Sequence, residues 1–260
     1  MREAREALSF AMKVRSNAFA IHYACESFDQ THPRVFAIAA RNLGTAATES
    51  FSIDKTAASL GVDLATATPS AIDRVERKML DGFFAFVGRH QGHHWLHWNM
   101  RDAKFGFDAI EDRHRALKGK PAHIPAAQRF DLSSRLFDLY GDRHAPKASR
   151  LQFIAAKNAI TLTDFLDGPE LGAAVSKRDH ARVLRSTLRK ADILYEIADK
   201  AERAKLKTNA KTLDPYGGWG GALHYLRDHP LYLVVVIGII PFLTLVLRAR
   251  DVLAWLRGTH

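Results

Sequence analysis

The stretch NAFAIHYACESF (residues 17–28) decides the fold class, because its apolar side chains recur at every second position. This two-residue period is typical of a β-strand and is carried by Phe19, Ile21, Tyr23 and Cys25. After a turn at residues 31–33, RVFAIAARNL (34–43) and TESFSI (48–53) supply two more strand-like runs. Three consecutive strands with short links predict an antiparallel meander.

Helical spacing begins after the meander. Apolar residues follow three- and four-residue steps in AIDRVERKMLDGFFAFVGRH (71–90), which predicts an amphipathic helix ending near Gly88. HWLHW (94–98) is a short strand candidate. Further helices are expected at residues 103–117, 131–140, 148–158 and 178–204. This order predicts an α/β domain over residues 17–205, with a mixed sheet flanked by helices and a leading helix at 1–16.

The composition is that of a globular protein with a basic surface. Of 260 residues, 47% are hydrophobic and 25% charged, and 38 Lys and Arg against 28 Asp and Glu give a net charge of +10. This charge favours nucleic acid or an acidic membrane surface as partner. The lone cysteine, Cys25, excludes an internal disulfide framework and a cysteine-based zinc site, and it favours a reducing compartment.

The end of the chain contains an uncharged run, LYLVVVIGIIPFLTLVL (231–247), which Arg248 closes. Its helical length is about 26 Å, slightly less than the roughly 30 Å hydrocarbon layer. We therefore predict a single transmembrane helix at 231–248, after a linker at 206–230 and before a basic tail at 249–260. The N-terminal domain would be cytoplasmic, because no signal peptide precedes it. The alternative is a buried core helix, and Pro241 would bend either one.

Several short motifs resemble one nuclease family. ACESF, RVFAIAARNL and ESFSI are followed by ERKMLDGFFAFV, HWNM and FGFDAIEDR. In this order they resemble the motifs of the DEDD superfamily of 3'-to-5' exonucleases, over about residues 17–200. The resemblance implies a ribonuclease H-like fold. It also implies cleavage of nucleic acid with two divalent cations, Mg²⁺ or Mn²⁺, held by carboxylates.

The acidic residues that the resemblance implies are only partly present. Ala24 stands where the first Asp is expected, whereas Glu26 matches the acid two residues later. Gly106 replaces a second Asp. The last motif is matched by TLRKAD, which keeps Asp192 but places Thr187 at the general-base histidine. Two of four acids remain in this register, so we expect weak or absent metal binding by Glu26 and Asp192.

A register shift would offer a third acid. Asp108 lies two residues beyond Gly106, which on a helix turns it about 200° from the intended face. Asp102 is nearer that face but is expected in a loop. Glu26, Asp192 and Asp108 are thus the candidate catalytic residues. The alternative is that they are ordinary surface or salt-bridged carboxylates.

Candidate nucleic-acid contacts gather near the last predicted helix. They are Arg178, Arg182, Arg185, Arg189 and Lys190, together with Trp98 as a stacking platform for unpaired bases. The alternatives are a solvated helix face and a tryptophan packed in the core. The histidines His90, His93, His94 and His97 offer zinc-type ligands, although no acid or cysteine accompanies them. Hydrogen bonding at a surface is the alternative.

Three functions are consistent with these features. The first is a membrane-anchored pseudoenzyme that binds single-stranded DNA, RNA or a protein partner with little or no cleavage. The second is an active metal-dependent 3'-to-5' exonuclease. The third is a membrane-perturbing effector in which the predicted span assembles into a homo-oligomer and the N-terminal domain acts as a sensor.

Overall fold

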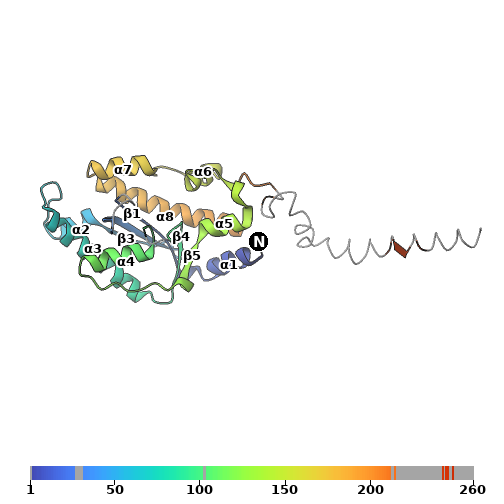
Figure 1. Ribbon diagram of the computed structural model, residues 1–260, viewed down its shortest axis with the longest axis horizontal. Coiled ribbons are helices and arrows are strands. Elements are labelled where there is room, and N and C mark those ends of the chain that lie inside the picture. The colour runs from blue at the N-terminus through green and yellow to red at the C-terminus, as the bar shows by residue number, and fades with distance from the viewer. Residues whose placement is uncertain are drawn as a thin grey trace, which may run out of the picture. The chain divides into compact units, whose positions relative to one another are not determined.

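A computed structural model describes residues 2–26, 32–101, 104–211 and 214, together with residues 242, 244, 245 and 248 (Figure 1). Its strands form one five-stranded sheet in the order β3-β2-β1-β4-β5. Their bounds are Ala18–Cys25 (β1), Val35–Asn42 (β2), Thr48–Ser52 (β3), His94–His97 (β4) and Arg129–Asp131 (β5). The pairs β1–β2 and β2–β3 are antiparallel, whereas β1–β4 and β4–β5 are parallel. The predicted meander and mixed α/β sheet are therefore confirmed.

Helices flank this sheet. The α-helices are Arg2–Lys13 (α1), Ile53–Ser59 (α2), Pro69–Arg89 (α3), Phe107–Ala116 (α4), Leu132–Tyr140 (α5), Arg150–Lys157 (α6), Gly168–Ser176 (α7) and His180–Glu202 (α8). Short 3-10 helices are Arg15–Asn17 (η1), Ala126–Gln128 (η2) and Asp142–His144 (η3). Figure 1 shows α8 running along the sheet and α7 beside it. The elements α2, α7 and β5 were not predicted, because they are too short to show a clear hydrophobic period.

The central strand β1 is buried on both faces, and its alternate side chains belong to two different hydrophobic clusters. Phe19, Ile21 and Tyr23 belong to the hydrophobic cluster that contains the apolar side of α3. Ala18 and Ala20 point to the opposite face and belong to the cluster that contains the apolar side of α8. Small side chains on that face allow the long helix to lie close to the strand. The strand therefore positions α3 and α8 on opposite sides of one sheet.

Local signals set the beginnings of the long helices. Thr68 caps α3 by accepting a hydrogen bond from the Ala71 amide at 3.3 Å, and Pro69 occupies the first turn. Asp179 caps α8 in the same way, through the amide of Arg182 at 3.0 Å. These caps satisfy backbone donors that a helix cannot satisfy internally. The Asp179 cap fixes the start of α8, which lies near the carboxyl end of β1. There the His180 ring stacks on the Phe36 ring of β2, with ring centroids 5.5 Å apart.

The chain divides into two compact units, Met1–Asn209 and Ala210–His260. Both hydrophobic clusters lie in the first unit. A search of the described residues found no helix with the length and apolar character needed to cross a membrane. Apart from residues 242, 244, 245 and 248, the predicted span at 231–248 and the predicted tail at 249–260 lie outside the described residues. The membrane anchor stays a prediction.

Candidate ligand-binding site

The two acids predicted to bind metal each pair with an arginine. One arginine directly precedes strand β2 and the other lies within it. Glu26, just after β1, lies 3.8 Å from the Nη1 of Arg34, and it also accepts the Arg34 amide at 3.3 Å. Asp192, on α8, accepts a hydrogen bond from Nη1 of Arg41 at 2.8 Å. The two carboxylates therefore bind separate arginines and do not face a common cation site.

The third candidate acid, Asp108, lies in the first turn of α4 and accepts a hydrogen bond from Arg129 at 2.8 Å. Gly106, at the position expected for an acid, contributes its backbone instead. Its amide donates to the hydroxyl of Tyr23 at 3.1 Å. Asp102 lies outside the described residues. Gly106 therefore contacts a side chain near the carboxyl end of β1 through its backbone, and it offers no carboxylate.

Metal ligands do not gather in the described part of the chain. Within residues 2–26, 32–101 and 104–211, no group of three or more His, Cys, Asp or Glu side chains is arranged to hold an ion. The carboxylates of Glu26, Asp108 and Asp192 each have a guanidinium as counter-ion. Such a donor set does not fit a pair of divalent cations, which needs several uncommitted oxygens around each ion.

The histidines of the RHQGHHWLHW segment turn to different partners. His90 Nδ1 is 2.9 Å from the carbonyl oxygen of Phe86, and His93 stacks on Phe19. His94 contacts Phe10 edge to face, with ring centroids 5.1 Å apart. His97 is buried, and burial lowers its pKa to about 4. The histidines therefore act as ring and hydrogen-bond partners in the packing between β1, α3 and β4.

The basic residues proposed to track phosphates differ in their exposure and in their partners. Arg178, Arg185 and Arg189 donate hydrogen bonds to carbonyl or carboxylate oxygens of neighbouring loops. Arg182 is exposed, and the part of the chain that the structure describes offers its side chain no partner. Lys190 is only 8% exposed and points to the sheet side of α8. Trp98 is also 8% exposed and lies in a hydrophobic cluster. Whether any of them binds nucleic acid stays a prediction.

A cavity of 550 Å³ lies where β1, α7 and α8 meet. His22, Ala24 and Glu26 line it from β1 and its end, and Lys190 lines it from α8. Leu171 and Val175 of α7, with Phe105, give much of the remaining wall an apolar character. Ala24 and Glu26, two of the positions that the resemblance assigns to acids, therefore line this cavity, whereas Gly106 and Asp192 do not.

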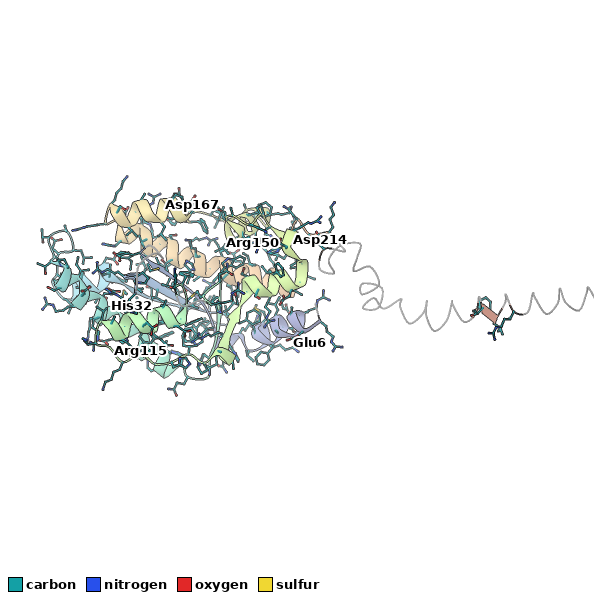
Figure 2. The ribbon with its side chains drawn as sticks, viewed as in Figure 1. Glu6, His32, Arg115, Arg150, Asp167 and Asp214 are labelled. Atoms are coloured by element: carbon teal, nitrogen blue, oxygen red, sulfur yellow. The ribbon has the colours of Figure 1, made fainter. Side chains whose placement is uncertain are left out.

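Lys190 is the charged group on the helix side of this cavity. Its ammonium nitrogen lies 5.0 Å from the centre of the Phe165 ring, in a cation–π contact. Burial lowers the pKa of Lys190 to about 8, while the charges of Asp167 and Glu170 oppose that shift. Asp167 is labelled in Figure 2, where it lies at the start of α7. Most Lys190 side chains are therefore cationic near neutral pH.

Two further polar side chains line the β1 wall. The Nδ1 atom of His22 is buried and has no hydrogen-bond partner. Burial, followed by the charge of Lys190, lowers the pKa of His22 well below its ordinary value, so the ring is neutral. Burial raises the pKa of the Cys25 thiol to about 12. Cys25 is therefore a thiol rather than a thiolate and is a poor nucleophile.

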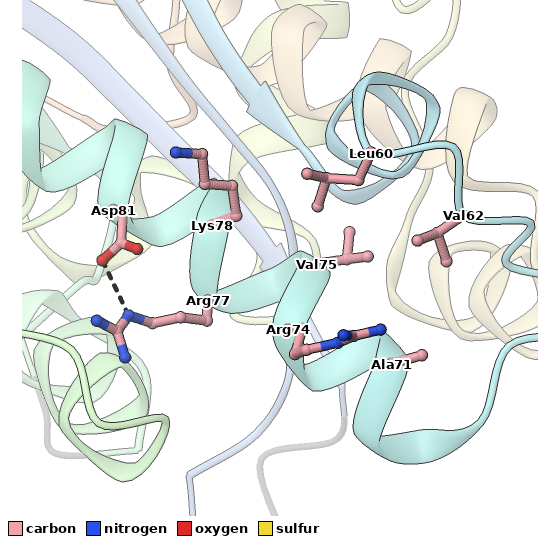
Figure 3. A pocket seen from close by; sticks show the side chains of 8 residues that line it. All are labelled: Leu60, Val62, Ala71, Arg74, Val75, Arg77, Lys78 and Asp81. Atoms are coloured by element: carbon pink, nitrogen blue, oxygen red, sulfur yellow. Dashed lines mark hydrogen bonds and ion pairs between the residues drawn. The ribbon is translucent and has the colours of Figure 1, made fainter.

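A second pocket, of 480 Å³, lies over the exposed side of α3 (Figure 3). Arg74 and Lys78 are exposed, and the described residues supply neither with a side-chain partner. Arg77 between them donates to Asp81 at 2.9 Å, the dashed line in Figure 3, and to the carbonyl of Leu117 at 2.8 Å. This surface was not predicted from the sequence, although the four-residue step from Arg74 to Lys78 places both on one helix face.

Comparison with protein-family models, with curated proteins and with solved structures gives no match for this chain.

Proposed function

We propose that the first unit is a ribonuclease H-like domain that binds nucleic acid or a protein partner with little or no cleavage. The order of elements supports the fold assignment, because three consecutive strands, a helix, a further strand and then mostly helices follow one another as the resemblance implies. The observation that carries the function is the pairing of Glu26, Asp192 and Asp108 with separate arginines. Without converging carboxylates, two-cation catalysis loses its ligands.

The surface that best supports nucleic-acid binding is the exposed side of α3. We define the α3 basic surface as Arg74, Arg77 and Lys78, which line one pocket together with a single acid, Asp81. Because Asp81 is already bonded to Arg77 and His114, it does not neutralise the two exposed cations. Uncommitted cations of this kind bind phosphates by releasing counter-ions, and such binding weakens as salt rises.

Binding is tested by titrating residues 1–209 with labelled single-stranded DNA and RNA at several salt concentrations. The double variant Arg74→Ser with Lys78→Ser should weaken binding. The slope of log binding constant against log salt concentration should become shallower by about 1 to 2, as for the loss of one or two phosphate contacts. The matched control is Lys13→Ser with Arg15→Ser, which removes the same charge from another exposed place. Equal loss in both pairs would show that net charge alone is responsible. No salt-sensitive binding at low ionic strength would remove the nucleic-acid part of the proposal.

Cleavage is tested separately with labelled oligonucleotides in Mg²⁺ or Mn²⁺. We expect no degradation above a no-protein control. Degradation that is lost in Glu26→Gln or Asp192→Asn would establish the second function, an active exonuclease, and would overturn the proposal.

The membrane part of the proposal rests on residues 231–248 alone. Fractionation of cells that express the full chain, compared with a version ending at residue 229, tests it. We expect the full chain with the membrane fraction and the shorter chain without it. If the full chain also makes cells permeable and the shorter one does not, the membrane-perturbing function replaces simple anchoring.

A further inference from the structure

We propose that the cavity between β1, α7 and α8 binds a small organic anion, whose charged group contacts Lys190 and His22 and whose apolar part lies against Leu171 and Val175. This site is distinct from the α3 basic surface, since the two pockets share no lining residue. Anion binding in this cavity is therefore independent of nucleic-acid binding on the α3 basic surface, and the two can be tested separately.

Lys190 is a largely buried cation without a carboxylate partner among the described residues. Lys190 is 8% exposed, and within the described residues its ammonium makes a cation–π contact with the Phe165 ring, 5.0 Å away, but no hydrogen bond or ion pair. No carboxylate in the described part of the chain lies within 4.0 Å of its nitrogen. Buried ammonium groups are normally paired, because removal from water is unfavourable without a compensating partner. The cavity in front of Lys190 is where that partner can bind.

The carboxylates nearest to Lys190 already have other hydrogen-bond partners. Asp167 accepts the amide of Glu170 at 2.9 Å, and Glu170 accepts the amide of Asp167 at 3.1 Å. This reciprocal capping box holds both acids at the start of α7. Glu26, at the cavity edge, is bonded to the amide of Arg34 and lies near its guanidinium. The charges of Asp167 and Glu170 favour the cationic form of Lys190. None of the three acids forms an ion pair with it.

The His22 ring also has a nitrogen without a hydrogen-bond partner. Its Nδ1 atom is buried without a partner and lines the same cavity as Lys190. A neutral imidazole nitrogen that carries its proton donates one hydrogen bond. An anionic oxygen placed between the two side chains would satisfy both the imidazole and the ammonium. A cation in that position would be repelled by the Lys190 ammonium.

The shape and lining of the cavity favour an anion with an apolar part. Its volume, 550 Å³, is within the range of roughly 300 to 1,000 Å³ that is usual for small-ligand pockets. Leu171, Val175 and Phe105 supply apolar wall, and the small residues Ala24 and Gly172 leave the space open. A fully hydrated inorganic ion would leave this apolar wall without contact. A carboxylate or phosphate monoester on a short alkyl or aromatic body would cover it.

The test uses hexanoate, hexyl phosphate and the uncharged hexanamide as probes in calorimetric titrations of the full-length protein and of residues 1–209, which contain both hydrophobic clusters. We expect both anions to bind and hexanamide to bind at least about tenfold more weakly, as for the loss of one charge-assisted hydrogen bond. Comparison of hexanoate with hexyl phosphate identifies the preferred anionic group. Equal binding of hexanamide and the anions would overturn the proposal.

Two variants test separately the positive charge of Lys190 and the open volume of the cavity. Lys190→Met removes the ammonium and keeps an unbranched apolar side chain, so anion binding should fall about tenfold or more while hexanamide binding stays unchanged. Gly172→Leu keeps Lys190 but fills the cavity. A Cβ at Gly172 meets no neighbouring element within 4 Å, so this variant should fold and lose all three probes.

The matched control is Lys177→Met, which removes an exposed charge at the end of α7 and should leave probe binding unchanged. Thermal melts without probe establish that each variant is folded. Anion binding that survives in both Lys190→Met and Gly172→Leu would place the anion elsewhere and overturn the proposal. The α3 double variant should bind the probes normally even if it no longer binds nucleic acid, which keeps the two proposals distinguishable.

Discussion

The carboxylate of Asp192 on α8 accepts a hydrogen bond from the guanidinium of Arg41 on β2, with 2.8 Å between Oδ1 and Nη1. In the sheet, Arg41 is paired with Ala20, near the start of β1, whereas Glu26 follows the end of that strand. Six residues of strand correspond to about 20 Å along the sheet. The two acids retained from the nuclease pattern therefore lie at different levels of β1.

Added Mg²⁺ or Mn²⁺ should leave the melting temperature of residues 1–209 unchanged. The stabilisation by a ligand rises with the logarithm of the ratio of its concentration to its dissociation constant. Carboxylates already paired with arginine offer little affinity for a metal ion. Differential scanning fluorimetry at millimolar metal, with a chelator-treated sample as reference, measures this. A manganese-dependent rise in melting temperature that disappears in Asp192→Asn would contradict the prediction and show a metal site on α8.

Glu76→Ala should be among the most destabilising single changes. Its side chain is 0% exposed, it accepts the Val35 amide at 2.8 Å, and it pairs with Arg34 and Arg113. Its removal leaves two guanidinium groups with fewer partners next to the core, at an expected cost of about 3 to 5 kcal/mol. Urea denaturation measures the free energy of unfolding.

The control for Glu76→Ala is Glu6→Ala. Glu6 also pairs with an arginine, Arg2, but the two side chains are 70% and 93% exposed. A pair in water of this kind contributes about 0 to 1 kcal/mol. A similar loss of stability in both variants would show that the cluster around Glu76 is not a buried charge network.

Lys190→Met should stabilise the protein below about pH 8 and lose this advantage as the pH rises to 10.5. Burial lowers the pKa of Lys190 to about 8 from the ordinary 10.5, despite Asp167 and Glu170. The unfolded chain therefore binds more protons between these values, and stability of the natural chain rises with pH there. A shift of this size corresponds to about 3 kcal/mol at most.

The measurement for Lys190 is the difference in unfolding free energy between the natural chain and Lys190→Met across that pH range. Taking the difference removes the contribution of Cys25, whose raised pKa lowers stability at alkaline pH in both proteins. Lys177→Met is the control and should show no pH-dependent difference. A constant difference between Lys190→Met and the natural chain at all pH values would mean that the ammonium is well solvated.

Gly119→Ala should destabilise the protein by about 1 to 3 kcal/mol. A Cβ at residue 119 would lie 2.0 Å from Cδ2 of His114. The His114 ring is 1% exposed, stacks on Phe84 with centroids 4.8 Å apart, and has Nε2 2.8 Å from Asp81. It has little room to move. Thermal or urea unfolding measures the loss.

Gly88→Ala is the opposite case and serves as the control for Gly119→Ala. Gly88 lies near the end of α3, and an added Cβ meets no neighbouring element within 4 Å. Alanine restricts the unfolded chain and favours the helix, so stability should rise by about 0.5 to 1 kcal/mol. If both alanine variants behave alike, the close approach of His114 to Gly119 is not present in solution.

Much of the fold was predictable because its main elements carry long or regular hydrophobic patterns. The alternation in β1 and the three- and four-residue steps in α3 each lead to one secondary structure. The short helix α7 was missed, since its sequence GPELGAAVS has few large apolar residues. Its stability depends on the capping box of Asp167 and Glu170 and on packing against α8. The three-residue strand β5 likewise depends on pairing with β4.

The sequence by itself determined the α/β class, the order of the main strands and helices, the net positive charge and the absence of acids at Ala24 and Gly106. Only the tertiary structure decided which side chains meet. Neither the Arg41–Asp192 pair nor the approach of Lys190 to His22 is visible along the chain, because more than 140 residues separate the members of each pair. Periodicity specifies which face of an element is buried, whereas a site depends on how separate elements are packed against one another.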